Sequence, residues 1–166
     1  MDIRPLEPED ADEVAALQSR LWRATYTGLV PDRVLRVRDD AANVRVWRKR
    51  ARDHALRGRS DEGATTLVAH DRDGRPIGWA STGPPRDDDP PTATELWSLY
   101  VAEEHHGSGV AHELLEAALP SPAAAHLWVL RGNDRAIAFY RKRGFLPDGT
   151  SKHDDRLGAD ELRLVR

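Results

Sequence analysis

Two glycines between an apolar run and a helical pattern constrain the fold of this chain more than any other feature. Residues 94–101 have the composition of a buried strand, Gly107 and Gly109 follow, and an apolar helical face begins at Val110. The first N–H groups of a helix attract anions, and glycine lets an anion approach the backbone because it has no Cβ. We therefore expect a strand–loop–helix junction that binds phosphate, and a pyrophosphate is the ligand that suits it best.

Other glycine patterns fit this junction poorly. A Walker loop ends in Gly-Lys followed by Ser or Thr, and no Gly-Lys pair occurs in the sequence. A dinucleotide fingerprint would need a third glycine where His112 stands, and it would normally lie in an early parallel strand–helix unit. Ser108 is not a nucleophile of the Gly-x-Ser-x-Gly kind, because His106 and Val110 occupy the flanking positions. A dinucleotide-binding enzyme is therefore the weaker alternative.

Hydrophobic periodicity predicts helices and strands along the rest of the chain. Helices are expected at residues 9–23, at residues 43–56, from Val110 to a stop at Pro120, and from a cap at Asn133 or Asp134 to Gly144. Strands are expected at residues 3–5, 65–69, 77–82, 94–101 and 126–130, with two more in residues 145–166. The turn at residues 71–74 makes its flanking strands an antiparallel hairpin, so the sheet is not purely parallel.

The composition fits one globular domain that spans residues 1–166. Hydrophobic residues make up 39% of the chain, which is typical of a globular protein. The net charge of -3 means that the chain lacks the excess positive charge that attracts nucleic acid or an anionic membrane. The chain has no cysteine, which excludes disulfides, thiolate zinc sites and cysteine nucleophiles. Residues 1–12 lack the features of a signal peptide and no apolar run reaches membrane-spanning length, so we expect a cytoplasmic protein without nucleic-acid or membrane partners.

Four sequence blocks in a fixed order carry a family resemblance: residues 95–101, 106–111, 133–140 and 143–145. They resemble the GNAT superfamily of acetyl-CoA-dependent N-acetyltransferases, and the resemblance covers nearly the whole chain. The superfamily's phosphate loop runs Gln/Arg-x-x-Gly-x-Gly/Ala, which Gly109 and Ala111 match at the two small positions. His106 replaces the first Gln or Arg, so one side-chain contact to the pyrophosphate is expected to be weaker or pH-dependent.

The resemblance implies an α/β (α+β) fold, with a mixed, mostly antiparallel sheet of six to seven strands flanked by about four helices. It implies acetyl-CoA as the cofactor, and direct attack of an amine on the thioester within a ternary complex. The cofactor-binding residues that it implies are Leu99, Tyr100, Val101, His106, Gly107, Ser108, Gly109, Val110, Ala111, Asn133, Ala136 and Tyr140.

The same resemblance assigns chemical roles. Tyr140 is expected to be the general acid, because the family tyrosine lies near the CoA sulfur and a phenol can protonate a thiolate. Glu95 lies where several family branches carry the carboxylate that activates the amine, directly or through water. Without the resemblance, Tyr140 fits a core anchor, Glu95 an edge-strand surface acid and Asn133 a helix cap. Trp22 and Tyr26 are expected to wall the acceptor pocket, although the helical spacing of Trp22 also fits a core position.

The acceptor is open at this stage. Acids at residues 87–89 and 154–155 favour a cationic amine, on either a small molecule or a protein. His105, His106 and His112 are too close together for metal geometry, so we expect no metal. The alternative to an enzyme is a non-catalytic acyl-CoA-binding module that has kept the fold. A homodimer is the assembly to test first, because homodimers are the commonest soluble oligomers.

Overall fold

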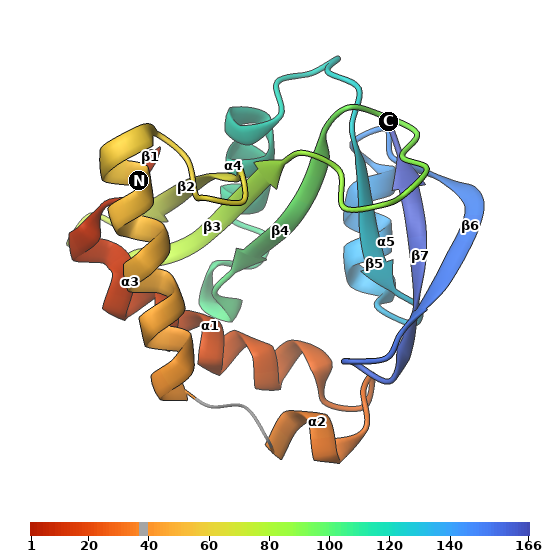
Figure 1. Cartoon of the computed structure of the whole chain (residues 1–166), viewed down its shortest axis with the longest axis horizontal. Coiled ribbons are helices and arrows are strands. Elements are labelled where there is room, and N and C mark those ends of the chain that lie inside the picture. Colours follow the sequence, from red (N-terminus) through yellow and green to blue (C-terminus); the bar gives the residue numbers. More distant parts are fainter. Residues whose placement is uncertain (37–39) are drawn as a thin grey trace.

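The computed structural model describes residues 1–36 and 40–166, and its strands form one seven-stranded sheet with the order β1-β2-β3-β4-β5-β7-β6 (Figure 1). The neighbouring strands are antiparallel, except that β4 and β5 are parallel. This confirms the predicted mixed, mostly antiparallel sheet. The strands are β1 (Asp2–Pro5), β2 (Thr65–His70), β3 (Pro76–Gly83), β4 (Glu95–Val101), β5 (His126–Leu130), β6 (Leu146–Asp154) and β7 (Ala159–Val165).

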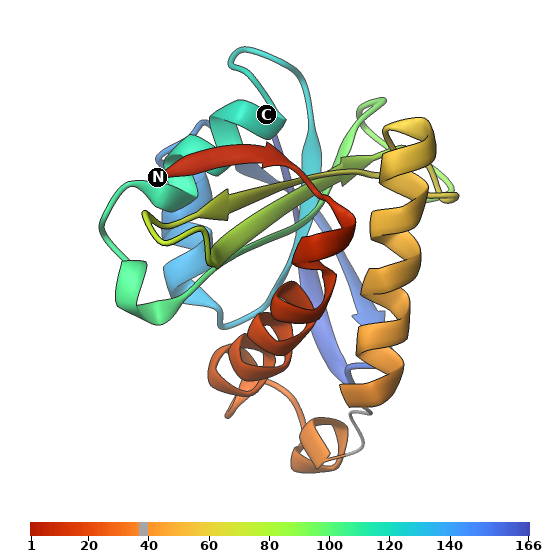
Figure 2. The ribbon, with the colours of Figure 1, turned by 90° about the vertical axis from the view of Figure 1, so that its left-hand side faces the viewer.

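Helices cover both faces of the sheet. Figure 2 shows α1 and α3 on one side and α4 and α5 on the other. The described residues form five α-helices where about four were expected: α1 (Ala11–Tyr26), α2 (Asp32–Arg36), α3 (Asp40–Arg57), α4 (Val110–Ala118) and α5 (Asp134–Arg141). Periodicity missed α2 because five residues are too few to show a helical repeat, and none of them is buried. Within the described ranges, every helix is too short or too polar to cross a bilayer.

Each face of the sheet has its own hydrophobic core. On one face, Trp47 of α3 meets Trp79 of β3 edge-on, with the ring centroids 5.4 Å apart, and both side chains are fully buried. On the other face, Leu114 of α4 packs against β3 and β4, and Tyr140 of α5 packs with Leu127 of β5. The sheet is therefore fixed between two helical layers.

The parallel strands β4 and β5 separate soon after they meet. Their register consists of two pairs, Glu95 with His126 and Leu96 with Leu127. β4 also contains a bulge, since Ser98 pairs with Ser81 but Leu96 pairs with the next residue of β3, which leaves Trp97 as the extra residue. A bulge bends its strand. The facing edges of β4 and β5 beyond Leu96 and Leu127 can therefore pair with a ligand.

Side chains alternate between the two faces of β5, as they do in any strand. Leu127 and Val129 pack with Tyr140 on the α5 side of the sheet. Trp128 points to the opposite side, where its indole Nε1–H donates to the carboxylate of Asp87 at 3.0 Å. Asp87 belongs to residues 84–94, which connect β3 to β4 and are called the β3–β4 loop below. This loop therefore covers the face of the sheet opposite α5.

The ends of α5 agree with the sequence prediction. The Asn133 side-chain oxygen accepts a hydrogen bond from the backbone N–H of Ala136 at 3.3 Å, which confirms the predicted cap. At the other end Gly144 has φ +84°, the N–H of Phe145 donates to Tyr140 O at 3.1 Å, and the N–H of Gly144 donates to Arg141 O. This pattern ends helices with a left-handed residue, which is why a glycine stands there.

Candidate active site

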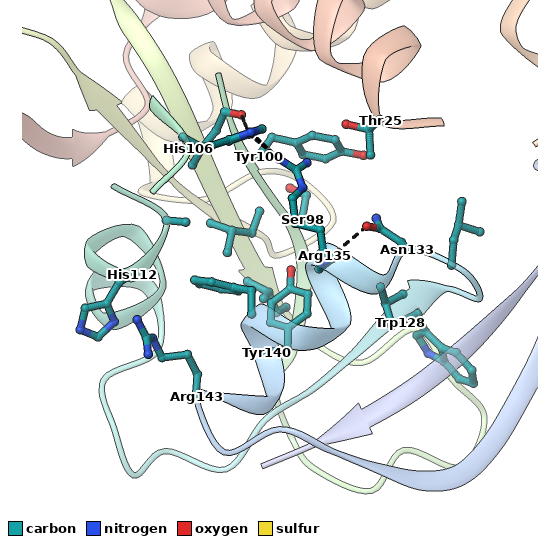
Figure 3. Close-up of a pocket in the computed structure, with 18 of the residues that line it drawn as sticks. Thr25, Ser98, Tyr100, His106, His112, Trp128, Asn133, Arg135, Tyr140 and Arg143 are labelled. Carbon is teal, nitrogen blue, oxygen red and sulfur yellow. Dashed lines mark hydrogen bonds between the residues drawn. The ribbon is translucent and has the colours of Figure 1, made fainter. Parts of the chain in front are cut away.

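A cavity of about 400 Å³ opens where β4 and β5 separate (Figure 3). Its walls come from β4, β5, α5, the C-terminal end of α1 and the predicted phosphate loop, residues 106–111, called the glycine loop below. Blocks far apart in the sequence thus meet around one cavity. The predicted site residues that line it are Tyr26, Leu99, Tyr100, Val101, His106, Gly107, Gly109, Ala111, Asn133, Ala136 and Tyr140, whereas Trp22, Glu95, Ser108 and Val110 do not line it.

The glycine loop follows β4 and leads into α4, as its sequence predicts, with two glycines in a conformation that glycine adopts readily. Gly107 and Gly109 have φ +79° and +99°, in the left-handed region that other residues rarely adopt. Gly109 is the N-cap of α4, so the first N–H groups of that helix face outward without intrahelical acceptors. The Ser108 hydroxyl donates to His105 O at 2.7 Å and is directed at the loop's own backbone. The loop therefore offers backbone donors rather than a nucleophile.

His106 is held between the end of β4 and α5. Its Nε2 lies 3.1 Å from the carbonyl oxygen of Val101, and the Arg135 guanidinium contacts the ring, including Nδ1. These contacts allow the ring to donate from Nε2 to Val101 O and to accept from Arg135 at Nδ1. Figure 3 shows Arg135 reaching from α5 toward His106. A guanidinium thus stands beside the position where the family pattern has Gln or Arg.

Two further basic side chains, an arginine and a histidine, line the same part of the cavity. Arg143 follows α5 and His112 lies on α4, and Figure 3 shows the two side chains next to each other. Sequence reasoning did not single out Arg135 or Arg143. The available signal for Arg135 was its position in the first turn of α5, two residues after the cap, which aims its side chain at the N-terminal end of the helix. This side of the cavity is suited to phosphates.

Tyr140 is buried, and its ring meets Phe139 and Phe145 edge-on at centroid distances of 5.3 and 5.9 Å. Its hydroxyl is directed into the middle of the cavity (Figure 3). Burial, and to a lesser extent the neighbouring Tyr26, raise the pKa of the Tyr140 phenol. The phenol is therefore protonated at neutral pH and can donate a hydrogen bond. Tyr140 therefore packs in the core with its ring and reaches the cavity with its hydroxyl.

Tyr26 links α1 to β4 at the edge of the cavity. Its hydroxyl lies 2.5 Å from that of Tyr100, and both side chains line the cavity. Trp22 packs edge-on against Tyr26, with the ring centroids 4.4 Å apart, but it does not line the cavity itself. Of the two predicted wall residues, the structure brings Tyr26 to the site and places Trp22 behind it.

Glu95 is fully buried, so the expectation of a surface acid is wrong. Its Oε2 accepts from the backbone N–H of Arg86 at 2.8 Å, and its Oε1 accepts from the Arg86 guanidinium. Strand alternation and the Trp97 bulge direct this side chain under the β3–β4 loop, and it does not line the cavity. The structure therefore does not bring Glu95 to the cavity that Tyr140 lines.

Residues 20–145 match the family described as acetyltransferase (GNAT), which covers the glycine loop, β5 and α5. The match extends over more than half of the chain. The protein belongs to the GNAT acetyltransferase family.

Similar proteins agree with this assignment. A probable N-acetyltransferase of Mycobacterium tuberculosis is 31% identical, over 89% of this chain and 80% of that protein. An acetyltransferase of Pseudomonas aeruginosa named for L-methionine sulfoximine and L-methionine sulfone is 31% identical, over 64% of this chain and 60% of that protein. The crystal structure of the PaiA N-acetyltransferase of Thermoplasma acidophilum in complex with coenzyme A has a TM-score of 0.70 and 20% identity, and covers 98% of this chain and 96% of that one.

This GNAT protein is thus an N-acetyltransferase, as the sequence resemblance implied, and it catalyses acyl transfer. In the described part of the chain, no group of three or more His, Asp or Glu side chains is arranged to hold a metal ion. The pocket lining adds one carboxylate that sequence reasoning did not single out, Glu161 of β7.

Proposed function

We propose that this GNAT enzyme transfers an acetyl group from acetyl-CoA to a primary amine by direct attack in a ternary complex. The observation that carries the proposal is the cavity between β4 and β5, which extends from the glycine loop to the C-terminal end of α1. One cavity with two ends can hold a donor and an acceptor together. The chain has no cysteine to carry an acyl-enzyme intermediate of the thioester kind, which also favours direct transfer.

The residues around the glycine loop fit the donor. The outward N–H groups at Gly109 and the start of α4 suit a pyrophosphate, with Arg135 and Arg143 as neighbouring cations. The edge of β4 at Leu99–Val101 offers backbone N–H and C=O groups to the amides of the pantetheine arm, because β5 has separated from it there. Acetyl-CoA would then place its sulfur near Tyr140.

The proposed chemistry balances with the groups in the cavity. The amine nitrogen attacks the thioester carbonyl carbon, the C–S bond breaks, and an acetamide and a thiolate form. The thiolate takes a proton from Tyr140, whose buried phenol is protonated at neutral pH, and Tyr140 regains a proton from the nitrogen of the attacking amine. The ammonium form of the amine gives up two protons, one before the attack and one as the C–S bond breaks.

The acceptor that the relatives suggest is a small amine. The Pseudomonas aeruginosa relative carries the name of two amino-acid derivatives, L-methionine sulfoximine and L-methionine sulfone. L-methionine sulfone and n-butylamine, one with and one without a carboxylate beside the amine, are therefore the first two acceptors to test. A protein amino group is the next class.

The test combines binding with turnover. Calorimetry of the purified protein is expected to show binding of acetyl-CoA and CoA, but not of NAD. Because the chain has no cysteine, a thiol reagent reports only the CoA released during acetylation. Tyr140→Phe is expected to bind acetyl-CoA like the wild type and to lower kcat by about 100-fold, the usual contribution of a general acid. Binding of acetyl-CoA without turnover of either amine would exclude both as acceptors, and preference for NAD would contradict the proposal.

A further inference from the structure

The charges that line the cavity are distributed unequally. Arg135, Arg143 and three histidines lie at the glycine loop and the neighbouring parts of α4 and α5. Among the lining residues of the described structure, the one carboxylate is that of Glu161. A cavity with cations at one end and a carboxylate elsewhere suits an anionic donor and a cationic acceptor.

The strand register places Glu161 on the face of the sheet opposite α5. On β7, Leu162 and Leu164 belong to the hydrophobic cluster that includes Tyr140, so the residues that alternate with them face the other side. Glu161 pairs with Leu130 of β5, just beyond the point where β4 and β5 separate. Its carboxylate therefore reaches the cavity from the face of the sheet opposite α5.

Aromatic rings line the cavity on the same side as Glu161. Trp128 alternates with the α5-facing residues of β5 and lines the cavity together with Trp97 and Tyr26. Figure 3 shows Trp128 across Tyr140 from His112 and Arg143. Aromatic faces and a carboxylate are the usual surroundings of a bound ammonium group. The Trp128 ring already attracts one cation, the ammonium of Lys152, which lies 3.8 Å from the ring centroid.

We propose that Glu161, rather than Glu95, binds the ammonium group of the acceptor and accepts its proton. The inference rests on the proposed function and identifies the acceptor as a primary amine that enters in its cationic form. The ammonium gives one proton to Glu161, and the neutral amine attacks the carbonyl carbon. The second proton leaves the nitrogen as the C–S bond breaks, and it restores to Tyr140 the proton that Tyr140 has given to the thiolate. Glu161 then releases its proton to solvent.

The environment of Glu161 supports a basic carboxylate. Burial raises the pKa of Glu161, and Asp154 of β6 acts in the same direction. Lys152, 3.9 Å away on β6, acts in the opposite direction, as do Arg86 of the β3–β4 loop and Arg156. A carboxyl group with a raised pKa accepts a proton more readily than an ordinary one. Activity is thus expected to fall when the pH falls through this raised pKa, because protonated Glu161 can neither bind the ammonium nor take its proton.

The first arm of the test measures binding and needs no turnover. The method is NMR of the CoA-bound protein with ¹³C-labelled glutamate carboxyls. The Glu161 resonance is assigned as the one that is present in the wild-type spectrum and missing from the spectrum of Glu161→Gln. Titration with n-butylammonium is expected to shift this resonance to saturation, whereas n-butanol leaves it in place. Equal effects of the amine and the alcohol, or no shift with either, would overturn the inference. Failure of acetyl-CoA to bind in calorimetry would contradict the proposed function separately.

The second arm measures turnover of the two test amines. Glu161→Gln is expected to lower kcat/KM for the amine by about 100-fold with unchanged acetyl-CoA affinity, and to lose the acidic limb of the pH profile. Asp160→Asn is the matched control, because Asp160 precedes Glu161 on β7 but is half exposed and pairs with His153 outside the cavity. If Glu161→Gln kept the wild-type kcat/KM and the wild-type pH profile, Glu161 could not be the group that binds the ammonium and accepts its proton.

Discussion

At the scale of the residue, Arg135 illustrates how one side chain can make up for another. The family pattern has Gln or Arg where this chain has His106, and the Arg135 guanidinium contacts that histidine from α5. A guanidinium binds phosphate through charge-assisted hydrogen bonds that an imidazole matches only when it is protonated. Arg135 is therefore the side chain on which phosphate binding is expected to depend most.

Arg135→Ala is expected to weaken acetyl-CoA binding about tenfold, or ~1.4 kcal/mol, through loss of one charge-assisted contact. Calorimetry at low and high salt measures the effect, which should shrink as salt screens the charge. Arg131→Ala is the matched control, because Arg131 is exposed, does not line the cavity and pairs loosely with Asp160. If the two variants lost equal affinity for acetyl-CoA, the effect would come from the general loss of positive charge and not from a specific contact of Arg135.

At the scale of the element, one carboxylate adds side-chain contacts to the backbone pairing of the N-terminal strand with β2. Asp10 is buried and accepts two hydrogen bonds of 2.8 Å from Arg4 of β1, one from the backbone N–H of Glu7, and contacts His70 of β2 at 2.9 Å. Burial alone would raise the pKa of Asp10, but these hydrogen bonds outweigh it and lower the pKa. The ionised carboxylate thus stabilises the attachment of β1 and the first helical turn to β2.

Asp10→Asn is expected to lower the free energy of unfolding by about 2 kcal/mol at pH 7, because it removes charge-assisted hydrogen bonds in a buried site. The lowered pKa means that the stabilisation is present above the ordinary carboxyl pKa and is lost as the pH falls through the folded-state value. Urea unfolding at neutral and acidic pH measures both effects, and the two proteins should converge in acid. Asp12→Asn, which breaks an exposed pair with Arg48, should change stability little. A pH-independent difference would contradict this account.

At the scale of the whole molecule, the β3–β4 loop connects the two halves of the sheet across the opening. Arg86 binds Glu95 on β4, and Asp87 accepts from Trp128 of β5. Thr92 contacts Nδ1 of the buried His126 at 2.8 Å. The loop therefore bears on strands at both sides of the cavity, and Glu95 stabilises this arrangement from beneath.

Glu95→Gln is expected to lower the free energy of unfolding by about 1–3 kcal/mol, because the buried Glu95 side chain loses charge-assisted hydrogen bonds to the half-exposed Arg86 guanidinium. The pH profile of acetylation should keep the limb that belongs to Glu161. Thermal unfolding and pH-dependent kinetics on the same preparation separate the two effects. Glu104→Gln, an exposed acid beside Arg20, is the control for loss of one negative charge. If Glu95→Gln instead kept the wild-type stability and lost the acidic limb of the acetylation pH profile, Glu95 would be the base.

Local sequence determined much of this protein. The left-handed glycines at positions 107, 109 and 144 and the Asn133 cap were predictable, because backbone conformation and capping depend on a few neighbouring residues. Family resemblance then predicted the sheet, the enzyme class and the blocks that meet around the cavity. These features persist wherever the same short patterns occur, so they could be recognised without coordinates.

Tertiary structure alone decided which acid faces the cavity. Glu95 and Glu161 both lie on strands, and nothing in the residues around them distinguishes a carboxylate buried under a loop from one that lines a pocket. The difference depends on the bulge at Trp97, on the place where β4 and β5 separate, and on the pairing of β7 with β5. A shift of one residue in a strand reverses which face a side chain occupies, and that register is set by contacts between distant segments.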